Sequence, residues 1–276
     1  MTRNLKRIIK KNKTLYNTSV FFYYLFFRFK ELLSEGNERR EYIQKIEDIK
    51  KKKRIVVDIA FCGIGDLLVW SSIPQLLKEQ LDVDFYISRS TRKLIKNHDI
   101  FKLVFIMNPF FKGVSDEVDC FRFKNFTRDS SLKEFLLDRG GLNNIEILEK
   151  QFNLNGSGLP KIYYKPNTMK NYANTVLIDK NMISGKKFGW IFKDEVFEKE
   201  GQKFGSKLEY VYKDRQDIFE YIDMMFSCKY FVCTFSGGAS LAAAIGINFS
   251  VVWPLNAKNR TNYQFVYSRS KGNYFV

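Results

Sequence analysis

The sequence predicts an α/β fold with parallel, doubly wound sheets. Short apolar runs, rich in β-branched and aromatic residues, alternate along residues 54–254 with stretches of helical periodicity. This alternation is typical of parallel strands that are joined by helices. Two of the runs lead into glycine turns, at residues 63–66 and 236–238. Because ligands of such sheets gather beyond the carboxyl ends of the strands, both turns are candidate parts of a ligand site.

The first half of the predicted fold begins with the apolar run at residues 54–60. Strands are expected at Arg54–Ala60, Asp82–Ser88 and Lys102–Met107, with a less regular candidate at Val118–Phe123. The spacing of apolar residues predicts helices at Leu67–Gln80, Arg89–Asn97, Leu132–Leu137 and Ile145–Phe152. The turn-rich stretch at 153–161 then predicts a linker between two halves.

The second half is expected to repeat the same kind of alternation. Strands are predicted at Thr175–Asp179, Leu208–Tyr212, Tyr230–Cys233 and Phe249–Trp253, and helices at Asp217–Ser227 and Ala239–Ile245. Gly246, directly after the last of these helices, is typical of a helix C-terminus. The resulting domain prediction is an N-terminal arm at 1–53, a first α/β domain at 54–168 and a second at 169–276.

The composition is that of a soluble globular protein with an anionic partner. The 276 residues are enough for two domains of ordinary size, and 45% of them are hydrophobic. A net charge of +16 fits nucleic acid, an acidic membrane surface or a phosphorylated substrate. The four cysteines, at 62, 120, 228 and 233, form no C-x-x-C pair and lie in apolar surroundings. We therefore expect buried thiols in a reducing cytoplasm rather than disulfides or a zinc site.

The predicted arm, residues 1–53, is basic, aromatic and helical in pattern. Six lysines and arginines within the first thirteen residues precede an aromatic block at 20–27, and residues 50–53 are all lysine. The aromatic block is too short to span a bilayer, and no small-residue cleavage site of a signal peptide follows it. A cationic flank beside an aromatic face favours a helix in the headgroup region of an anionic membrane. The alternative is a helix packed on the protein's own surface, with solvated lysines.

The turn at 236–238 joins an apolar strand to a helix of small residues. It lacks bulk where the helix begins, so backbone N–H groups and the positive end of the helix dipole can face an anion, typically phosphate. The alternative is that the glycines only allow tight packing between the helix and the sheet.

Considered together, the two turns resemble the signatures of a known family. Residues 63–68 (GIGDLL), with Pro74 and Leu77-Lys78 in the helix behind them, resemble the N-terminal signature of ADP-heptose–lipopolysaccharide heptosyltransferases. Ser236-Gly237, followed by 241–246 (LAAAIG), resembles the nucleotide-diphosphate turn of the same family. Residues 97–105 resemble the approach to the family's third strand, and 145–164 the passage into its second domain. The match covers most of residues 54–254.

This resemblance implies a family 9 glycosyltransferase with the GT-B fold, that is, two Rossmann-like domains. It implies that a sugar, heptose or a related one, passes with inversion from a nucleotide-diphosphate sugar to a lipopolysaccharide, lipooligosaccharide or capsule-type glycan acceptor. It implies neither a metal nor a cofactor. Asp66 would act as the general base on the acceptor hydroxyl. The alternative for Asp66 is an N-terminal helix cap, and the two roles are compatible.

The resemblance also implies which residues hold the two substrates. The donor phosphates would be bound by Ser236, Gly237, Gly238, Ala239 and Ser240, with positive charge added by Lys186 or Lys187. The alternative for the two lysines is an exposed loop of a basic protein. Gly63, Ile64 and Gly65 would form the turn on the acceptor side. Within the nucleotide-diphosphate turn, the chain departs from the family at two positions: Phe235 replaces its Asp before the Ser-Gly, and Ser240 replaces its His.

The partners that follow are a nucleotide sugar and an anionic glycolipid or oligosaccharide, with no nucleic acid. The enzyme would belong to bacterial cell-envelope biosynthesis. It would be cytoplasmic and peripheral on the inner face of the cytoplasmic membrane, which it would reach through residues 1–53.

Two other classes of protein remain as alternatives. Residues 56–66 also resemble the first motif of S-adenosylmethionine methyltransferases, D-x-G-C-G-x-G, but with the spacing off by one residue and without the first glycine. A methyltransferase would leave the Ser236 turn unexplained. A non-catalytic nucleic-acid-binding protein would fit the net charge and the aromatic residues, but the chain carries no RNA- or DNA-binding signature.

Overall fold

The computed structural model describes residues 40–60, 63–123, 142–181, 190–211, 217–255, 266–267 and 269–274. The chain divides into two compact units, residues 1–51 and 52–276. In the first unit, residues 40–51 are helical, and Tyr42, Ile46 and Ile49 are buried at a spacing of three and four residues. The aromatic block at 20–27 and the rest of the predicted arm up to residue 39 lie outside the described residues.

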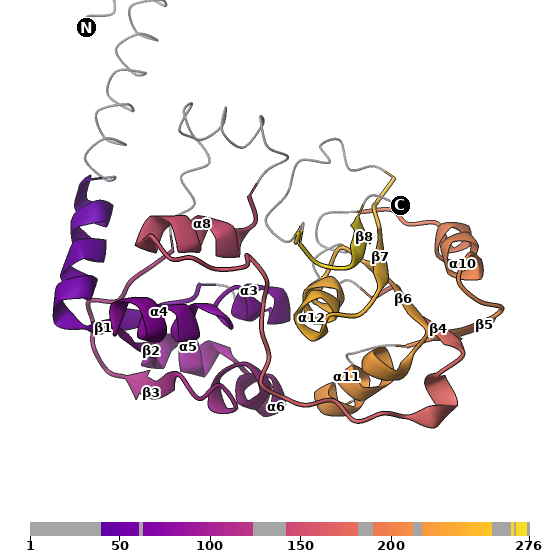
Figure 1. The fold of residues 1–276 in the computed structure, drawn as a ribbon, viewed down its shortest axis with the longest axis horizontal. Coiled ribbons are helices and arrows are strands. Elements are labelled where there is room, and N and C mark those ends of the chain that lie inside the picture. The colour runs from indigo at the N-terminus through magenta and orange to yellow at the C-terminus, as the bar shows by residue number, and fades with distance from the viewer. Residues whose placement is uncertain are drawn as a thin grey trace, which may run out of the picture. The chain divides into compact units, whose positions relative to one another are not determined.

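The described residues of the second unit form two β-sheets whose strands are all parallel (Figure 1). The first sheet has the order β1-β2-β3, formed by Arg54–Val57, Asp84–Ser88 and Phe111–Ser115. Val57 of β1 also pairs with Phe121 through a parallel bridge. Since β2 occupies one edge of β1, Phe121 occupies the other. Chain order therefore reverses at β1, which makes the boundary between β1 and Phe121 the topological switch point of this sheet.

The second sheet has the order β5-β4-β6-β7-β8. Its strands are β4 (Thr175–Asp179), β5 (Lys207–Tyr210), β6 (Tyr230–Thr234), β7 (Phe249–Val252) and β8 (Gly272–Tyr274). The order reverses between β4 and β6, so the switch point of this sheet lies between those two strands. The prediction of an α/β fold with parallel sheets is confirmed. The division of residues 54–276 at position 168 stays a prediction.

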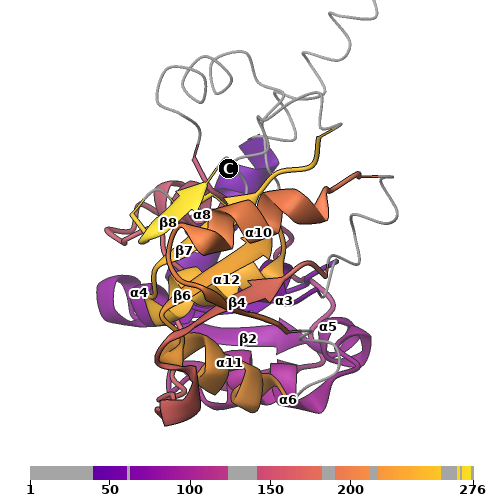
Figure 2. The same cartoon turned by 90° about the vertical axis from the view of Figure 1, so that its right-hand side faces the viewer.

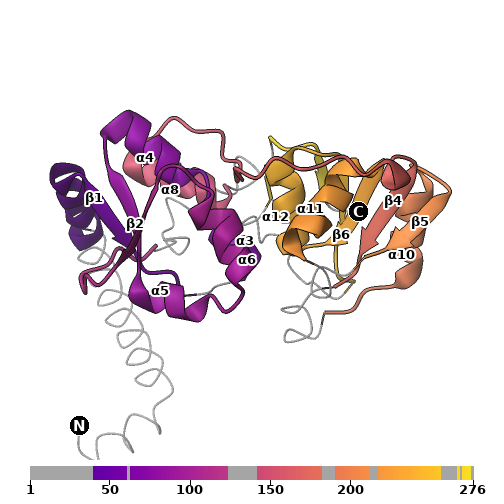
Figure 3. The ribbon, with the colours of Figure 1, turned by 90° about the horizontal axis from the view of Figure 1, so that it is seen from below.

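Helices cover the first sheet and carry the connections between its strands. They are α3 (Ile64–Leu68), α4 (Ile73–Leu81), α5 (Arg89–Leu94), α6 (His98–Phe101), the π-helix η1 (Lys102–Ile106) and α8 (Asn144–Phe152). Helix α4 contacts β2, and α8 contacts α4; Figure 3 shows both helices on one side of β1 and β2. Helix α8 begins at a capping box, in which Asn143 and Glu146 each bond the other's backbone N–H.

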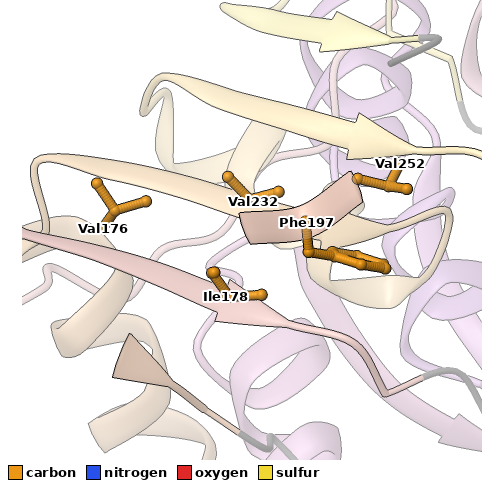
Figure 4. Packing of buried hydrophobic residues seen from close by; sticks show 5 residues of the cluster. All are labelled: Val176, Ile178, Phe197, Val232 and Val252. Atoms are coloured by element: carbon orange, nitrogen blue, oxygen red, sulfur yellow. The ribbon is translucent and has the colours of Figure 1, made fainter. Parts of the chain in front are cut away.

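The second sheet is covered on both faces by helices. These are α10 (Asp194–Gln202), α11 (Ile218–Ser227) and α12 (Gly237–Ile245), preceded by the 3₁₀ turn η2 (Lys170–Tyr172). Phe197 of α10 packs on Val176, Ile178, Val232 and Val252 (Figure 4). Because side chains alternate along a strand, Phe231 faces the opposite side, where it contacts Tyr221 of α11. Figure 2 shows α10 and α11 on opposite sides of the strands.

Two predictions in the first half are wrong. The expected strand at 102–107 is the helix η1, which continues α6 and buries Leu103, Val104 and Phe105. A short apolar run fits a buried strand and a buried helix equally well, and here tertiary packing selects the helix. The third strand of the sheet is instead β3.

The expected helix at 67–80 is two helices. Helix α3 ends at Leu68, and α4 begins at Ile73 with Pro74 in its first turn, where proline is tolerated because no intrahelical N–H bond is lost.

The cysteine prediction holds only in part. Cys233 is buried, whereas Cys120 and Cys228 are only partly buried, and no disulfide joins any of these three described cysteines. Cys62 and the predicted helix at 132–137 lie outside the described residues. Within the described parts of the chain, none of the helices combines the length and the apolar character needed to cross a bilayer.

Candidate functional site

Asp66 lies in a short helix that follows the first strand of the first sheet. Gly63 is the N-cap of α3 in an extended conformation, with φ −66° and ψ 152°, and Asp66 lies in the helix's first turn. The Asp66 carboxylate accepts the backbone N–H of Gly63. This contact is one half of a capping box, so Asp66 does have the helix-capping role that the sequence left open.

Burial sets the protonation behaviour of Asp66. It raises the pKa of this carboxyl to about 6, although the backbone N–H groups of Gly63 and Asp66 act in the opposite direction. A carboxylate with this pKa is mostly ionised at neutral pH and is a stronger base than an ordinary aspartate. Burial of this kind is how enzymes adjust a carboxyl for proton transfer, although structural carboxyls are also perturbed by burial.

The second turn begins at Ser236, the extended N-cap of α12. Its Oγ accepts the N–H of Gly238 at 3.2 Å, and its carbonyl accepts the N–H of Ala239 at 3.0 Å. Helix α12 ends at Gly246, which adopts the left-handed conformation with φ 72°, as expected for a helix C-cap. At the N-terminal end of the helix, a phosphate bound at the Ser236 turn would compete with the Ser236 hydroxyl for the N–H of Gly238.

Helices α3 and α12 contact each other at their first residues (Figure 1). A Cβ at Gly237 would lie 2.0 Å from Cγ2 of Ile64 and 3.3 Å from the backbone nitrogen of Gly65. Gly237 is thus required for packing, as the alternative interpretation held, but against another helix rather than against the sheet. The contact brings together the two turns that the sequence predicted separately, at 63–66 and 236–238.

A buried carboxylate lies below the Ser236 turn, at the switch point of the second sheet. Asp179, the last residue of β4, is fully buried; it accepts the Tyr221 hydroxyl at 2.7 Å and the Asn181 N–H at 2.8 Å. A Cβ at Gly238 would lie 3.2 Å from the Tyr221 hydroxyl and 3.5 Å from Asp179 Oδ2. Sequence reasoning missed this pair, although a polar residue at the end of an apolar strand was a usable signal.

Ser240, expected to bind donor phosphate, lies inside the protein. It is fully buried, and its hydroxyl is 3.2 Å from the hydroxyl of Tyr267, which is also fully buried. Burial raises the pKa of Tyr267 above its usual value. Tyr267 therefore packs against α12 with its hydroxyl next to that of Ser240. This position gives no support to a direct contact between Ser240 and a phosphate at the turn.

Phe235, which stands where the resembled family has Asp, stacks on Trp253 with ring centroids 4.7 Å apart. Lys186 and Lys187 lie outside the described residues. In the described parts of the chain, no group of three or more His, Cys, Asp or Glu side chains is arranged to hold a metal ion.

Comparisons with known proteins are limited to structure. No protein-family model matches the chain, and no curated protein matches it in sequence. The chain is similar to the dodecameric iron-containing heptosyltransferase TibC in complex with ADP-D-beta-D-heptose, with a TM-score of 0.50 and 11% identity. That match covers 72% of this chain and 57% of TibC, so the chain spans little more than half the length of that protein.

Two further structures match less closely in TM-score. TibC from enterotoxigenic E. coli H10407, described as a bacterial iron-containing dodecameric glycosyltransferase, has a TM-score of 0.49, 12% identity and the same coverage of 72% and 57%. The glycosyl transferase family 9 protein from Veillonella parvula DSM 2008 has a TM-score of 0.42 and 9% identity, over 80% of this chain and 85% of that one. At such identities, a TM-score of 0.50 to TibC shows a shared fold.

Proposed function

We propose that the chain is a glycosyltransferase with a GT-B-type arrangement, which transfers a sugar from a nucleotide-diphosphate sugar to a glycan acceptor. The observation that carries the proposal is the contact between α3 and α12. It places a carboxyl whose pKa is about 6 in a helix next to a turn that offers backbone N–H groups and a helix N-terminus. The fold likeness to TibC supports the same function.

In the proposed reaction Asp66 is the general base. Its carboxylate removes the proton of the acceptor hydroxyl while the oxygen forms a bond to the anomeric carbon of the sugar. The bond between that carbon and the diphosphate oxygen breaks, and its electron pair leaves on the diphosphate. Attack from the face opposite to the leaving group inverts the anomeric centre.

The departing diphosphate takes up negative charge at the start of α12. The Ser236 hydroxyl and the N–H groups of Gly237, Gly238 and Ala239 are the proposed donors, because the dipole of a nine-residue helix favours an anion there. Lys186 or Lys187 is proposed to add positive charge. We propose heptose or a related sugar as the group transferred, without a metal or a cofactor, from the resemblance of residues 63–68 and 236–246 to heptosyltransferases.

The proposed acceptor is an anionic glycolipid or oligosaccharide at the inner face of the cytoplasmic membrane. The net charge of +16 and the basic, aromatic residues 1–53 support attraction to such a surface. Sedimentation with vesicles of anionic phospholipid tests this part. Deletion of residues 1–53 is expected to abolish co-sedimentation without changing nucleotide binding, and full retention on the vesicles would contradict it.

The main test is thermal unfolding of the full chain with ADP, UDP, GDP, CDP, CMP and S-adenosylmethionine. A ligand at one hundred times its Kd stabilises a protein by about 2.7 kcal/mol. Stabilisation by one nucleoside diphosphate is expected for the native chain and for Lys199→Trp on the exposed face of α10, but not for Ser236→Trp. The control introduces the same side chain away from the turn.

Two results would contradict the proposal. Stabilisation by S-adenosylmethionine that persists in Ser236→Trp would favour a methyltransferase. No stabilisation by any of the nucleotides would mean that the Ser236 turn serves helix packing and does not bind a nucleotide.

A further inference from the structure

A second polar cluster lies at the switch point of the first sheet. Asp58 directly follows β1, Ser88 is the last residue of β2, and Phe121 pairs with the other edge of β1. The Asp58 N–H donates to the carbonyl of Phe121 at 2.9 Å. The side chains of Asp58, Ser88 and Arg122 therefore meet where the chain order of this parallel sheet reverses, which is where such sheets place their ligands.

Asp58 is held by four side-chain donors. Its Oδ1 accepts the hydroxyls of Ser88 at 2.8 Å, Ser90 at 2.6 Å and Thr91 at 3.3 Å, and its Oδ2 accepts Nε of Arg122 at 2.8 Å. The hydrogen bond from Ser90 contributes most to lowering the pKa of Asp58, while partial burial opposes it. Asp58 is thus a fixed carboxylate that is ionised at neutral pH, and only 14% of its side chain is exposed.

Arg122 is oriented by this carboxylate but is not covered by it. Only Nε bonds Asp58, and 75% of the Arg122 side chain is exposed. Among the described residues, the two terminal nitrogens of its guanidinium have no partner. A guanidinium anchored through one nitrogen presents its other N–H groups in a fixed plane, the arrangement that binds the two oxygens of a phosphate or carboxylate.

The neighbouring arginines differ from Arg122. Arg89 binds the Asp116 carboxylate through both Nε and Nη2, and Arg54 pairs with Glu117 at 3.5 Å. Arg89 and Arg54 thus already have carboxylate partners, and their positive charges offset the negative charges of Asp116 and Glu117. Arg89 is 63% exposed and carries the same charge as Arg122, so it is a matched control.

We propose that Arg122, held by Asp58, binds a phosphate or carboxylate group at the carboxyl edge of the first sheet, and that this group belongs to the acceptor. This inference rests on the proposed transferase function. The acceptor is the appropriate source because the Ser236 turn of the second sheet is the proposed place of the donor phosphates. Residues 59–63 also join Asp58 to α3, which carries the proposed base Asp66. Asp58 and Asp66 therefore lie on the same segment that leads from β1 into α3.

The test is an NMR titration of the full chain with three probes: inorganic phosphate, glucose 1-phosphate as a sugar phosphate, and ADP. The native chain, Arg122→Gln, Arg89→Gln and Ser236→Trp are compared. We expect Arg122→Gln to weaken binding of glucose 1-phosphate by about tenfold or more, as for loss of a charge-assisted bidentate contact. Arg89→Gln and Ser236→Trp are expected to retain this binding, and Arg122→Gln is expected to retain ADP binding.

The inference is overturned if Arg122→Gln titrates like the native chain, or if Arg89→Gln loses as much affinity. Equal, weak binding of inorganic phosphate and glucose 1-phosphate at Arg122 would mean an adventitious ion only and would also overturn it. Loss of ADP binding in Ser236→Trp, measured in the same series, reports on the donor site alone. Failure of this inference is thereby distinguished from failure of the proposed function.

Discussion

The two glycine turns of the second unit have similar backbones but carry different chemistry. Each follows a parallel strand, and each begins its helix at an extended N-cap, Gly63 for α3 and Ser236 for α12. Helix α3 has five residues and contains a carboxylate in its first turn, whereas α12 has nine residues and no ionisable side chain. The positive end of the α3 dipole therefore faces a carboxylate of its own helix, whereas α12 has no acidic residue in its first turn.

Under the proposed function, this difference divides two halves of a reaction between the two turns. In α3, burial raises the pKa of the Asp66 carboxyl to about 6, which suits the base proposed for it. In α12, the carboxylate nearby is Asp179, which is fully buried below the turn and bonded to Tyr221. The Ser236 turn itself presents a neutral hydroxyl and backbone N–H groups. Four predictions test this division of roles, ordered by the size of the change that each should produce.

The largest effect is expected on catalysis from Asp66→Asn. This change removes the base but keeps an oxygen that can accept the N–H of Gly63. We expect turnover to fall by about 10²–10⁴-fold, measured as sugar transfer from the donor whose nucleotide binds, with nucleotide affinity unchanged. Asp99→Asn, which changes an acid in the first turn of α6, is the control and should keep full activity. Activity near the native level in Asp66→Asn would mean that Asp66 caps α3 and is not the general base.

The same substitution is expected to change stability with pH. Because the folded-state pKa of Asp66 is raised from 3.8 to about 6, the folded chain binds more protons than the unfolded chain between these values. The native chain therefore loses stability as pH rises through this window. Asp66→Asn should be more stable than the native chain by up to about 3 kcal/mol at pH 8, and equal to it near pH 4. Parallel thermal unfolding curves at all pH values would contradict the raised pKa.

Gly237→Ala tests the contact between the two helices. The added methyl would lie 2.0 Å from Ile64, so we expect a loss of about 1–3 kcal/mol in unfolding free energy, together with weaker nucleotide binding. Ile64→Ala removes the opposing atoms, and the double variant should therefore lose less than the sum of the two single changes. Strict additivity in urea unfolding would mean that the two turns do not touch in solution.

The smallest change in stability is expected from substitutions of Ser236, which distinguish its capping role from its proposed role in phosphate binding. Ser236→Ala removes the bond to the N–H of Gly238 and should cost about 1 kcal/mol of stability. Ser236→Asp keeps a capping oxygen, so native-like stability is expected, but its charge should repel a diphosphate and abolish nucleotide binding. An aspartate variant that binds nucleotide as well as the native chain would remove Ser236 from the donor site.

Features whose signals are local could be predicted from the sequence. The strand Thr175–Asp179 was predicted with its observed bounds, and the helix before Gly246 with its observed C-terminus, because an apolar β-branched run and a left-handed glycine are each encoded within a few residues. Both glycine turns were also found by inspection of short segments. The resulting expectation of parallel sheets follows from the alternation of these local patterns.

Features that depend on residues far apart in the chain could be recognised only in the folded protein. Residues 102–106 became a helix because packing, not periodicity, discriminates between two ways of burying an apolar run. Gly237 faces Ile64, Ser240 faces Tyr267, and Asp58 holds Arg122, and none of these pairs is adjacent in sequence. A side chain's solvation and partners are set by the elements that pack around it, so the raised pKa of Asp66 and the fixed guanidinium of Arg122 are properties of the fold rather than of any single segment.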